Sequence, residues 1–256
     1  MKNIKALGQN WLKNREILDN IAMLSLPDNS NIETCLEIGP GLGTLTSSLL
    51  RIYPEVVAVE FDESLARNLP KSFPGKNLKV INEDFLKFDL NSITSPYVVA
   101  ANIPYYITSP IIQKLITAEH KPARIVLLVQ KEVAERIAAG AGEQTLLSLQ
   151  VQNFAVATLG PVVGREYFTP PPKVDSQVII LDPKPTPDVP EKVLSLAKLG
   201  FTNPRKKLIS NLSVSLQKPK AELAAIFAEL SFNLNARPAD LSLKDWEKLL
   251  ANLAKN

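Results

Sequence analysis

The chain has 256 residues, of which 45% are hydrophobic, with a net charge of +3 and a single cysteine. This length can bury a full core and allows one large domain plus a smaller one. A lone cysteine excludes an intramolecular disulfide, and the absence of an apolar leader or a membrane-length apolar run predicts a cytoplasmic protein without a membrane segment.

Charge is distributed unevenly along the chain. Residues 182–256 carry 12 Lys and Arg against 8 Asp and Glu, whereas the preceding residues carry 17 against 18. A basic C-terminal segment is typical of a protein that binds a phosphate-bearing partner, although surplus lysines can also be a solvated surface. Charge alone leaves these two interpretations open.

Apolar residues at helical spacing predict a helix over residues 14–26, with Asn14 as its N-cap. The apolar pair Trp11 and Leu12 precedes it, and we expect this pair to pack the N-terminal arm on the core.

A strand, a glycine loop and a helix are predicted next. An apolar run ending at Ile38 is followed by Gly39-Pro40-Gly41-Leu42-Gly43 and then by leucines at helical spacing. The glycines are spaced G-x-G-x-G, which differs from the G-x-G-x-x-G of dinucleotide-binding proteins. With Glu37 in front, the loop resembles the one that S-adenosylmethionine-dependent methyltransferases wrap around the methionine part of their cofactor. A glycine-rich turn without a ligand is the alternative.

Acidic residues follow the next two predicted strands. Glu60 ends the run of residues 56–59, where an acidic side chain in nucleotide-binding folds accepts hydrogen bonds from ribose hydroxyls. Asp62 is the rival candidate, or it caps the helix that follows. Asp84 comes after residues 78–81 and can accept a proton from an adenine amino group, with Phe85 as an apolar wall. The alternative for Asp84 is a turn acid.

The fourth strand, residues 97–101, ends in Asn102-Ile103-Pro104-Tyr105. The exocyclic amine of adenine is a poor nucleophile because its lone pair is delocalised into the ring. The Asn102 side-chain oxygen and the carbonyl beside Pro104 can each accept one amine hydrogen, while Tyr105 stacks on the base. This pattern favours direct methyl transfer to an adenine amine, driven by alignment and without a strong base or a metal.

The middle of the chain predicts a helix over residues 111–116, a strand over 125–129, a helix over 130–137 and strand-like patches over 146–163. The single histidine, His120, has no cysteine or second histidine nearby, so we expect no metal site.

A proline-rich loop, residues 166–176, contains Phe168 and Lys173. Stiff extended backbone can hold Phe168 against the second face of a flipped base, and Lys173 can reach an RNA phosphate. A core aromatic and a solvated lysine are the alternatives.

Four prolines between residues 183 and 190 indicate a linker, beyond which the pattern predicts helices over 191–199, 205–216, 220–230 and 243–253. We therefore expect a cofactor domain over residues 1–182 and a helical RNA-binding domain over 191–256. We expect Arg205-Lys206-Lys207 to contact the nucleic acid backbone.

Together these motifs make the chain resemble the KsgA-type small-subunit ribosomal RNA adenine dimethyltransferases, which are relatives of the Erm methyltransferases. The likeness covers nearly the whole chain. It is carried by residues 8–12, 36–43, 59–60, Asp84, 102–105, 129–136, 168–176 and 205–208. Departures from the family pattern are Trp11 for Phe, Glu83 for Gly, the segment 140–145 and Pro204.

The resemblance implies an α/β, Rossmann-like methyltransferase fold, with a doubly wound, mostly parallel sheet and a small C-terminal all-α domain. It implies transfer of methyl groups from S-adenosylmethionine to N6 of two adjacent adenosines in the hairpin near the 3′ end of small-subunit ribosomal RNA. The target adenine would lie between Tyr105 and Phe168. The implied cofactor contacts are Gln9, Asn10, Leu12, Glu37, Gly39, Gly41, Glu60, Asp84, Phe85 and Asn102.

The resemblance also implies a monomer that acts on the ribosomal small subunit or its precursor. The alternatives are an Erm-like enzyme for the large subunit, an assembly or RNA-binding factor with secondary catalysis, and, more remotely, a nicotinamide dehydrogenase.

Overall fold

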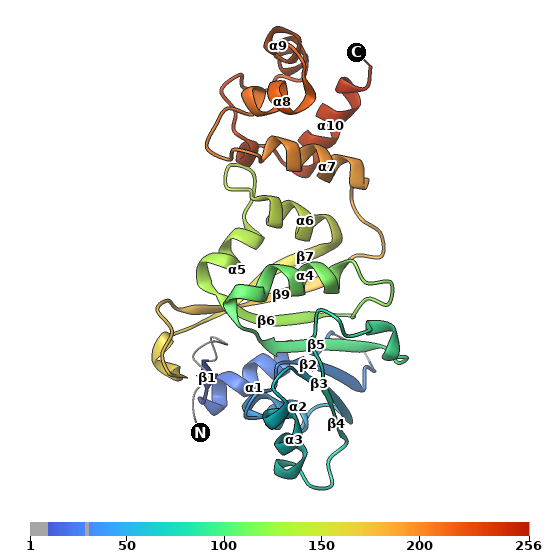
Figure 1. Ribbon diagram of the computed structural model, residues 1–256, viewed down its shortest axis with the longest axis vertical. Helices are drawn as coiled ribbons and strands as arrows, with labels where there is room; N and C mark the ends of the chain where they lie inside the picture. Colours follow the sequence, from blue (N-terminus) through green and yellow to red (C-terminus); the bar gives the residue numbers. More distant parts are fainter. Residues whose placement is uncertain (1–9, 29–30, 256) are drawn as a thin grey trace. The chain divides into compact units, whose positions relative to one another are not determined.

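The computed structural model describes residues 10–28 and 31–255 (Figure 1). The chain forms two compact units. The first comprises Met1–Ala134 and Val156–Pro183, and the second comprises Glu135–Ala155 and Lys184–Asn256.

A seven-stranded sheet in the order β4-β3-β2-β5-β6-β9-β7 forms the centre of the first unit. The strands are β2 (Thr34–Ile38), β3 (Glu55–Glu60), β4 (Leu78–Asn82), β5 (Tyr97–Asn102), β6 (Ile125–Gln130), β7 (Ala155–Val163) and β9 (Ser176–Pro183). The strands from β4 to β6 are all parallel, and β9 runs antiparallel to β6. The expected doubly wound, mostly parallel sheet is confirmed.

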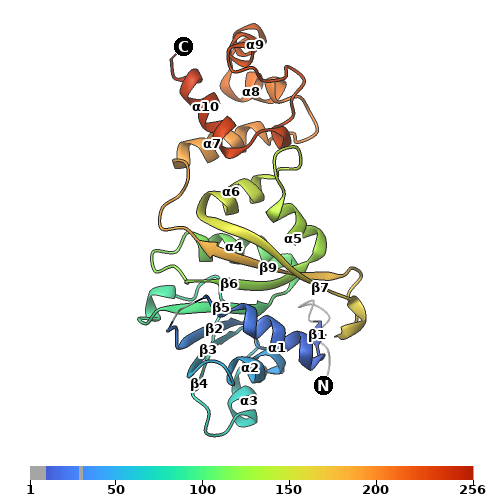
Figure 2. The same cartoon turned by 180° about the vertical axis from the view of Figure 1, so that it is seen from behind.

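Helices cover both faces of this sheet, as opposite views show (Figures 1 and 2). The elements are α1 (Arg15–Leu24), α2 (Thr44–Leu49), α3 (Glu63–Asn68), α4 (Thr108–Ile116) and α5 (Lys131–Ala138), with short 3₁₀ turns at Leu69–Ser72, Leu90–Ser92, Tyr105–Ile107 and Arg165–Tyr167. Strands covered on both faces read as continuous apolar runs, and every residue of β2 is accordingly buried.

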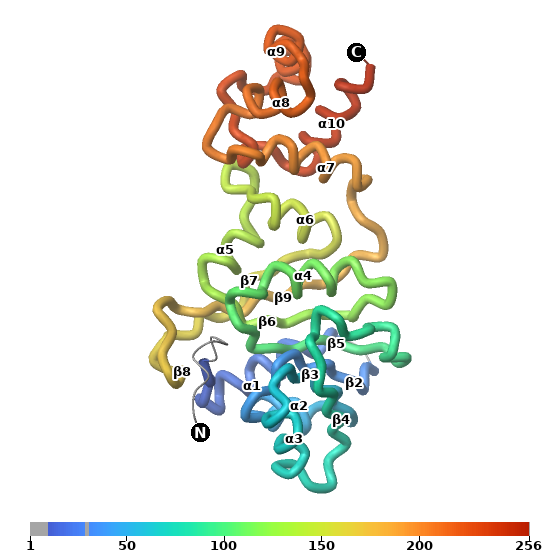
Figure 3. The backbone as a smooth tube through the Cα atoms, viewed as in Figure 1, coloured from blue at the N-terminus to red at the C-terminus, as the bar shows by residue number. Residues whose placement is uncertain are grey.

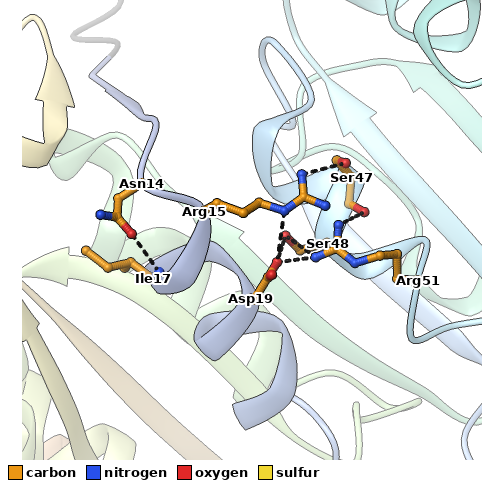
Figure 4. Close-up of polar contacts among 7 residues, drawn as sticks. All are labelled: Asn14, Arg15, Ile17, Asp19, Ser47, Ser48 and Arg51. Carbon is orange, nitrogen blue, oxygen red and sulfur yellow. Dashed lines mark hydrogen bonds and ion pairs between the residues drawn. The ribbon is translucent and has the colours of Figure 1, made fainter.

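The first turn of α1 is fixed as expected, because the Asn14 side chain accepts a hydrogen bond from the Ile17 backbone N–H at 3.1 Å. Figure 4 shows the contact between α1 and α2, where Asp19 receives hydrogen bonds from Ser48 and Arg51. Because α2 begins at the glycine loop, this network ties α1 to the loop.

A two-stranded antiparallel ladder pairs β1 (Trp11–Leu12) with β8 (Phe168–Thr169). Leu12 and Phe168 face each other in register and belong to the same buried cluster as Leu18 of α1. This ladder ties the N-terminal segment to the proline-rich loop.

The second unit is helical and has its own core around Trp246, Phe227 and Leu212. Its helices are α6 (Leu146–Phe154), α7 (Glu191–Gly200), α8 (Leu208–Leu216), α9 (Lys220–Glu229) and α10 (Leu243–Leu253), with a 3₁₀ turn at Pro238–Asp240. The predicted helices of the C-terminal segment are thus present.

Strand-like patches were predicted over residues 146–163. This was wrong for residues 146–154, which form helix α6, and only Ala155–Val163 is a strand. A capping box starts the helix: Thr145 and Ser148 bond each other's backbone N–H groups. Leu149 packs in the core of the second unit, and Asn153 bonds the backbone of Val189. Residues 135–155 therefore group with the C-terminal helices, although the sequence analysis placed them in the first domain.

The proline-rich segment 183–190 connects β9 to α7 (Figure 3). Helix α8 starts at Leu208, so Arg205–Lys207 lie in the turn before it and not inside it. Within the described ranges, no helix combines the length and apolarity needed to cross a bilayer.

Candidate functional site

A cavity of about 260 Å³ lies at the carboxyl ends of β2, β3, β4 and β5, which is where parallel α/β sheets bind ligands. Ten of the predicted site residues line it. They are Asn10, Glu37, Gly39, Gly41, Glu60, Asp84, Phe85, Asn102, Pro104 and Tyr105.

The glycine loop enters α2 along one wall of the cavity. Gly39 and Gly41 have φ angles of +63° and +57°, which favour glycine. A Cβ on Gly39 would meet no atom within 4 Å, so the space beside this residue is open to a ligand. A Cβ on Gly41 would lie 2.0 Å from the Trp11 ring, so the indole packs directly on the loop.

Glu37 is 1% exposed at the end of β2. The Thr46 hydroxyl donates a hydrogen bond to its carboxyl at 2.6 Å. Burial raises the pKa of Glu37 to about 8; the Thr46 hydrogen bond opposes this rise and the charge of Glu60 adds to it. This carboxyl group therefore carries a proton at neutral pH and can ionise when a cationic group binds beside it.

The Glu60 carboxylate is held by two backbone N–H donors, Gly41 at 3.0 Å and Asp62 at 2.9 Å. Burial raises the pKa of Glu60, and these hydrogen bonds oppose the rise. Each carboxylate oxygen keeps a second lone pair for a ligand hydroxyl. The rival, Asp62, caps α3 by accepting a hydrogen bond from Leu65, and only Glu60 of the two lines the cavity.

Asp84 and Phe85 lie in the loop after β4. Asp84 Oδ1 accepts the Leu86 backbone N–H at 3.0 Å, and within residues 10–28 and 31–255 no hydrogen bond reaches Oδ2. Phe85 is buried and stacks on Phe88 with ring centroids 6.4 Å apart. The pair thus presents a carboxylate oxygen and an apolar ring to the cavity.

Asn102 ends β5, and its Nδ2 donates to the backbone carbonyl of Asn10 at 3.2 Å. This contact fixes the orientation of the amide, because the nitrogen is engaged and Oδ1 is left as the acceptor. The N-terminal segment therefore contributes to the site by orienting Asn102.

Tyr105 begins a 3₁₀ turn after Pro104. Its hydroxyl is hydrogen-bonded to that of Ser176 on β9 at 2.7 Å. Burial raises the pKa of Tyr105, so the phenol is neutral. The backbone turn and the hydroxyl hydrogen bond together hold the ring at the cavity wall.

Two predicted residues lie outside the cavity lining. Leu12 and Phe168 are 0% and 3% exposed and pack together in the core of the first unit. The structure therefore does not bring Phe168 to the face of Tyr105. The predicted contact Gln9 lies outside the described residues.

The predicted RNA-contacting cations are all exposed: Lys173 in the proline-rich loop and Arg205, Lys206 and Lys207 in the turn before α8. In the part of the chain that the structure describes, no group of three or more His, Cys, Asp or Glu side chains is placed to hold a metal ion.

The sequence analysis missed three aromatic residues that line the cavity, Trp11, Phe61 and Tyr106. Tyr106 is 64% exposed. Each of the three directly follows a predicted site residue, Asn10, Glu60 or Tyr105, and this adjacency could have identified them from the sequence.

Comparison with known proteins gives a consistent result. The profile of the family described as "Ribosomal RNA adenine dimethylase" matches residues 1–254. A protein of Nostoc sp. named "Ribosomal RNA small subunit methyltransferase A" is 40% identical over 97% of both chains. A protein of the same name from Dehalococcoides mccartyi is 36% identical over 100% of this chain and 90% of its own.

Solved structures agree in fold. A dimethyladenosine transferase from Plasmodium falciparum superimposes with a TM-score of 0.78 at 30% identity, covering 95% of this chain and 97% of the other. The 23S rRNA methyltransferase ErmE gives a TM-score of 0.76 at 27% identity, covering 96% of this chain and 100% of the other.

Proposed function

The chain belongs to the ribosomal RNA adenine dimethylase family, and we propose that it methylates N6 of two adjacent adenosines, each twice, in the hairpin near the 3′ end of small-subunit ribosomal RNA. The protein is an S-adenosylmethionine-dependent methyltransferase that acts on ribosomal RNA. The choice of the small subunit is supported by the names of relatives up to 40% identical over nearly the whole chain.

One observation carries the proposal: a single cavity holds Glu60, Asp84 and the segment Asn102–Tyr105. The residues present fit S-adenosylmethionine, because the space beside Gly39 is open, Glu60 can accept ribose hydroxyls and Asp84 can accept from an adenine amino group. When bound, the cofactor supplies an electrophilic methyl group on a sulfonium. Glu37 is then the buried carboxyl available to its methionine part.

The chain's own residues prepare the target amine for attack. Asn102 Oδ1 and the carbonyl beside Pro104 each accept one hydrogen of the amine, which turns its lone pair out of conjugation with the ring. Tyr105, anchored through Ser176, stacks on the base and sets its plane. Catalysis then rests on alignment, so a strong general base is unnecessary.

We retain Phe168 as the proposed cover for the second face of the base. Because Phe168 is buried against Leu12, this role requires the β1–β8 ladder to change its packing when RNA binds.

For the RNA backbone, we propose phosphate contacts by Lys173 and by Arg205, Lys206 and Lys207, all of which are exposed. The partner in this proposal is the small subunit or its precursor, bound by a monomer in the cytoplasm.

The variant Asn102→Ala tests the proposal. We expect it to lose methyl transfer to small-subunit RNA while remaining folded, because it removes the ligand-facing acceptor Oδ1 and, within the protein, a single hydrogen bond to the Asn10 carbonyl. Asn91→Ala, an exposed asparagine away from the cavity, serves as the matched control. Undiminished turnover by Asn102→Ala would refute the mechanism.

The likeness to ErmE favours one second candidate, a large-subunit adenine methyltransferase. Methylation assays on purified small and large subunits, with modified adenines mapped by mass spectrometry, separate the two. Activity on the large subunit alone would replace the small-subunit assignment.

A further inference from the structure

The loop of residues 83–89, which carries Asp84 and Phe85, follows the edge strand β4. An edge strand is paired on one side only, so the loop lacks support from a further strand. Its backbone turns on itself, with Lys87 and Phe88 N–H groups donating to the Asp84 carbonyl at 2.8 and 3.1 Å. Among the described residues, no backbone N–H group outside regular helices and strands donates to the Leu86 or Phe88 carbonyl.

Lys114 of α4 supplies a donor for both carbonyls. Its ammonium group donates to the Leu86 carbonyl at 2.9 Å and to the Phe88 carbonyl at 2.5 Å. The same nitrogen lies 5.4 Å from the centroid of the Phe85 ring, within cation–π distance. One cation thus holds two points of the loop backbone and one face of its aromatic ring.

The charges around the loop support this arrangement. Burial lowers the pKa of Lys114, whereas the carboxylates of Glu83, Asp84 and Asp89 oppose that change. A partly buried ammonium group beside three carboxylates is attracted to the loop as a whole. Asp84 is therefore held near Lys114 without losing its Oδ2 to a direct ion pair with it.

Helix α4 also connects this contact to the reacting end of the cavity. It starts at Thr108, directly after the 3₁₀ turn Tyr105–Ile107, and the Thr108 hydroxyl donates to the Tyr105 carbonyl at 3.2 Å. Lys114 lies near the other end of the same helix. The helix therefore spans from the residues that face the target amine to the loop that carries Asp84 and Phe85.

We propose that Lys114 is a positioning residue for cofactor binding: by holding the Leu86 and Phe88 carbonyls and the Phe85 ring, it keeps Asp84 and Phe85 in place for the adenine of S-adenosylmethionine. This inference rests on the proposed role of Asp84 and Phe85 as adenine contacts. Lys114 itself touches neither the cofactor nor the target base in this scheme.

The first experiment compares Lys114→Met with wild type by calorimetric titration with S-adenosylhomocysteine. Methionine keeps much of the side-chain volume but cannot donate to the carbonyls. We expect Lys114→Met to bind about tenfold more weakly, because the loop must then be ordered when the cofactor binds, at a cost comparable to one charge-assisted hydrogen bond. We expect kcat at saturating cofactor and the KM for RNA to stay within about twofold of wild type, and Lys114→Arg to recover part of the affinity.

Lys87→Met is the matched control, because Lys87 lies in the same loop but its side chain is exposed. It should bind S-adenosylhomocysteine as wild type does. Wild-type affinity of Lys114→Met would overturn the proposal. A fall in melting temperature, kcat and RNA affinity together with cofactor affinity would also overturn it, since that pattern marks a general structural role.

A cofactor analogue that carries unsubstituted purine in place of adenine, and so has no N–H on that edge of its base, tests whether Lys114 acts through Asp84. Because this analogue cannot donate to Asp84, we expect the affinity loss caused by Lys114→Met to be smaller with it. An equal loss for both ligands would overturn the route through Asp84. Methylation of ribosomal RNA by the wild-type protein is measured separately, so failure of the proposed function is distinguishable from failure of this inference.

Discussion

The buried carboxyl group of Glu37 makes the stability of this protein depend on pH in a way that one substitution should remove. In the folded protein its pKa is about 8, compared with 4.5 for an unperturbed glutamate. Between these values the unfolded chain has released the proton while the folded chain still holds it. The free energy of unfolding therefore falls as pH rises, by up to about 1.4 kcal/mol per pH unit.

From pH 5.5 to pH 7.5 this contribution amounts to about 2.5 kcal/mol. For a chain of this size that free energy corresponds to roughly 5–10 °C in melting temperature. In Glu37→Gln the side chain cannot ionise, while its oxygen can still accept the hydrogen bond from Thr46. Between pH 5.5 and pH 7.5 we therefore expect the melting temperature of wild type to fall by roughly 5–10 °C more than that of the variant.

Thermal unfolding followed by circular dichroism at pH 5.5, 6.5 and 7.5 measures this difference. Glu33→Gln is the matched control, because Glu33 is exposed just before the same strand; it should keep the wild-type pH dependence. Parallel melting curves for wild type and Glu37→Gln across this range would show that the carboxyl group titrates normally and that the reasoning from burial is wrong.

Three further predictions concern the site. Gly41→Ala should weaken binding of S-adenosylhomocysteine by at least tenfold in equilibrium titrations, because its Cβ would overlap the Trp11 ring at a φ of +57°; wild-type affinity would contradict this packing. Ser176→Ala removes the hydrogen-bond partner of Tyr105, so steady-state assays should show methyl transfer several-fold slower with cofactor affinity unchanged. Replacing Arg205, Lys206 and Lys207 together with Ala should weaken RNA binding and reduce the salt dependence of log K by about 2 in filter-binding assays, whereas an unchanged slope would remove these residues from the RNA contact.

The sequence was sufficient to predict the parallel sheet and the edge at which the site lies. Buried apolar runs defined the strands, and the residues after them, Gly39, Glu60, Asp84 and Asn102, share one cavity because the carboxyl ends of parallel strands meet at one edge. Asn14 as the cap of α1 was predictable for the same local reason. Each of these inferences needed only residues adjacent in the chain.

Tertiary structure alone decided the remaining points. A short apolar run such as residues 146–154 is compatible with the period of a helix or of a strand. These residues form a helix in which Leu149 packs in the core of the second unit. Phe168 is buried because β8 pairs with β1, more than 150 positions away in sequence. The hydrogen bonds from Lys114 to the Leu86 and Phe88 carbonyls join helix α4 to loop residues that lie 26 to 28 positions earlier in the sequence. Periodicity and local motifs indicate which conformations neighbouring residues favour. Contacts between segments distant in sequence form only when the chain folds, and burial then determines which of these conformations is adopted.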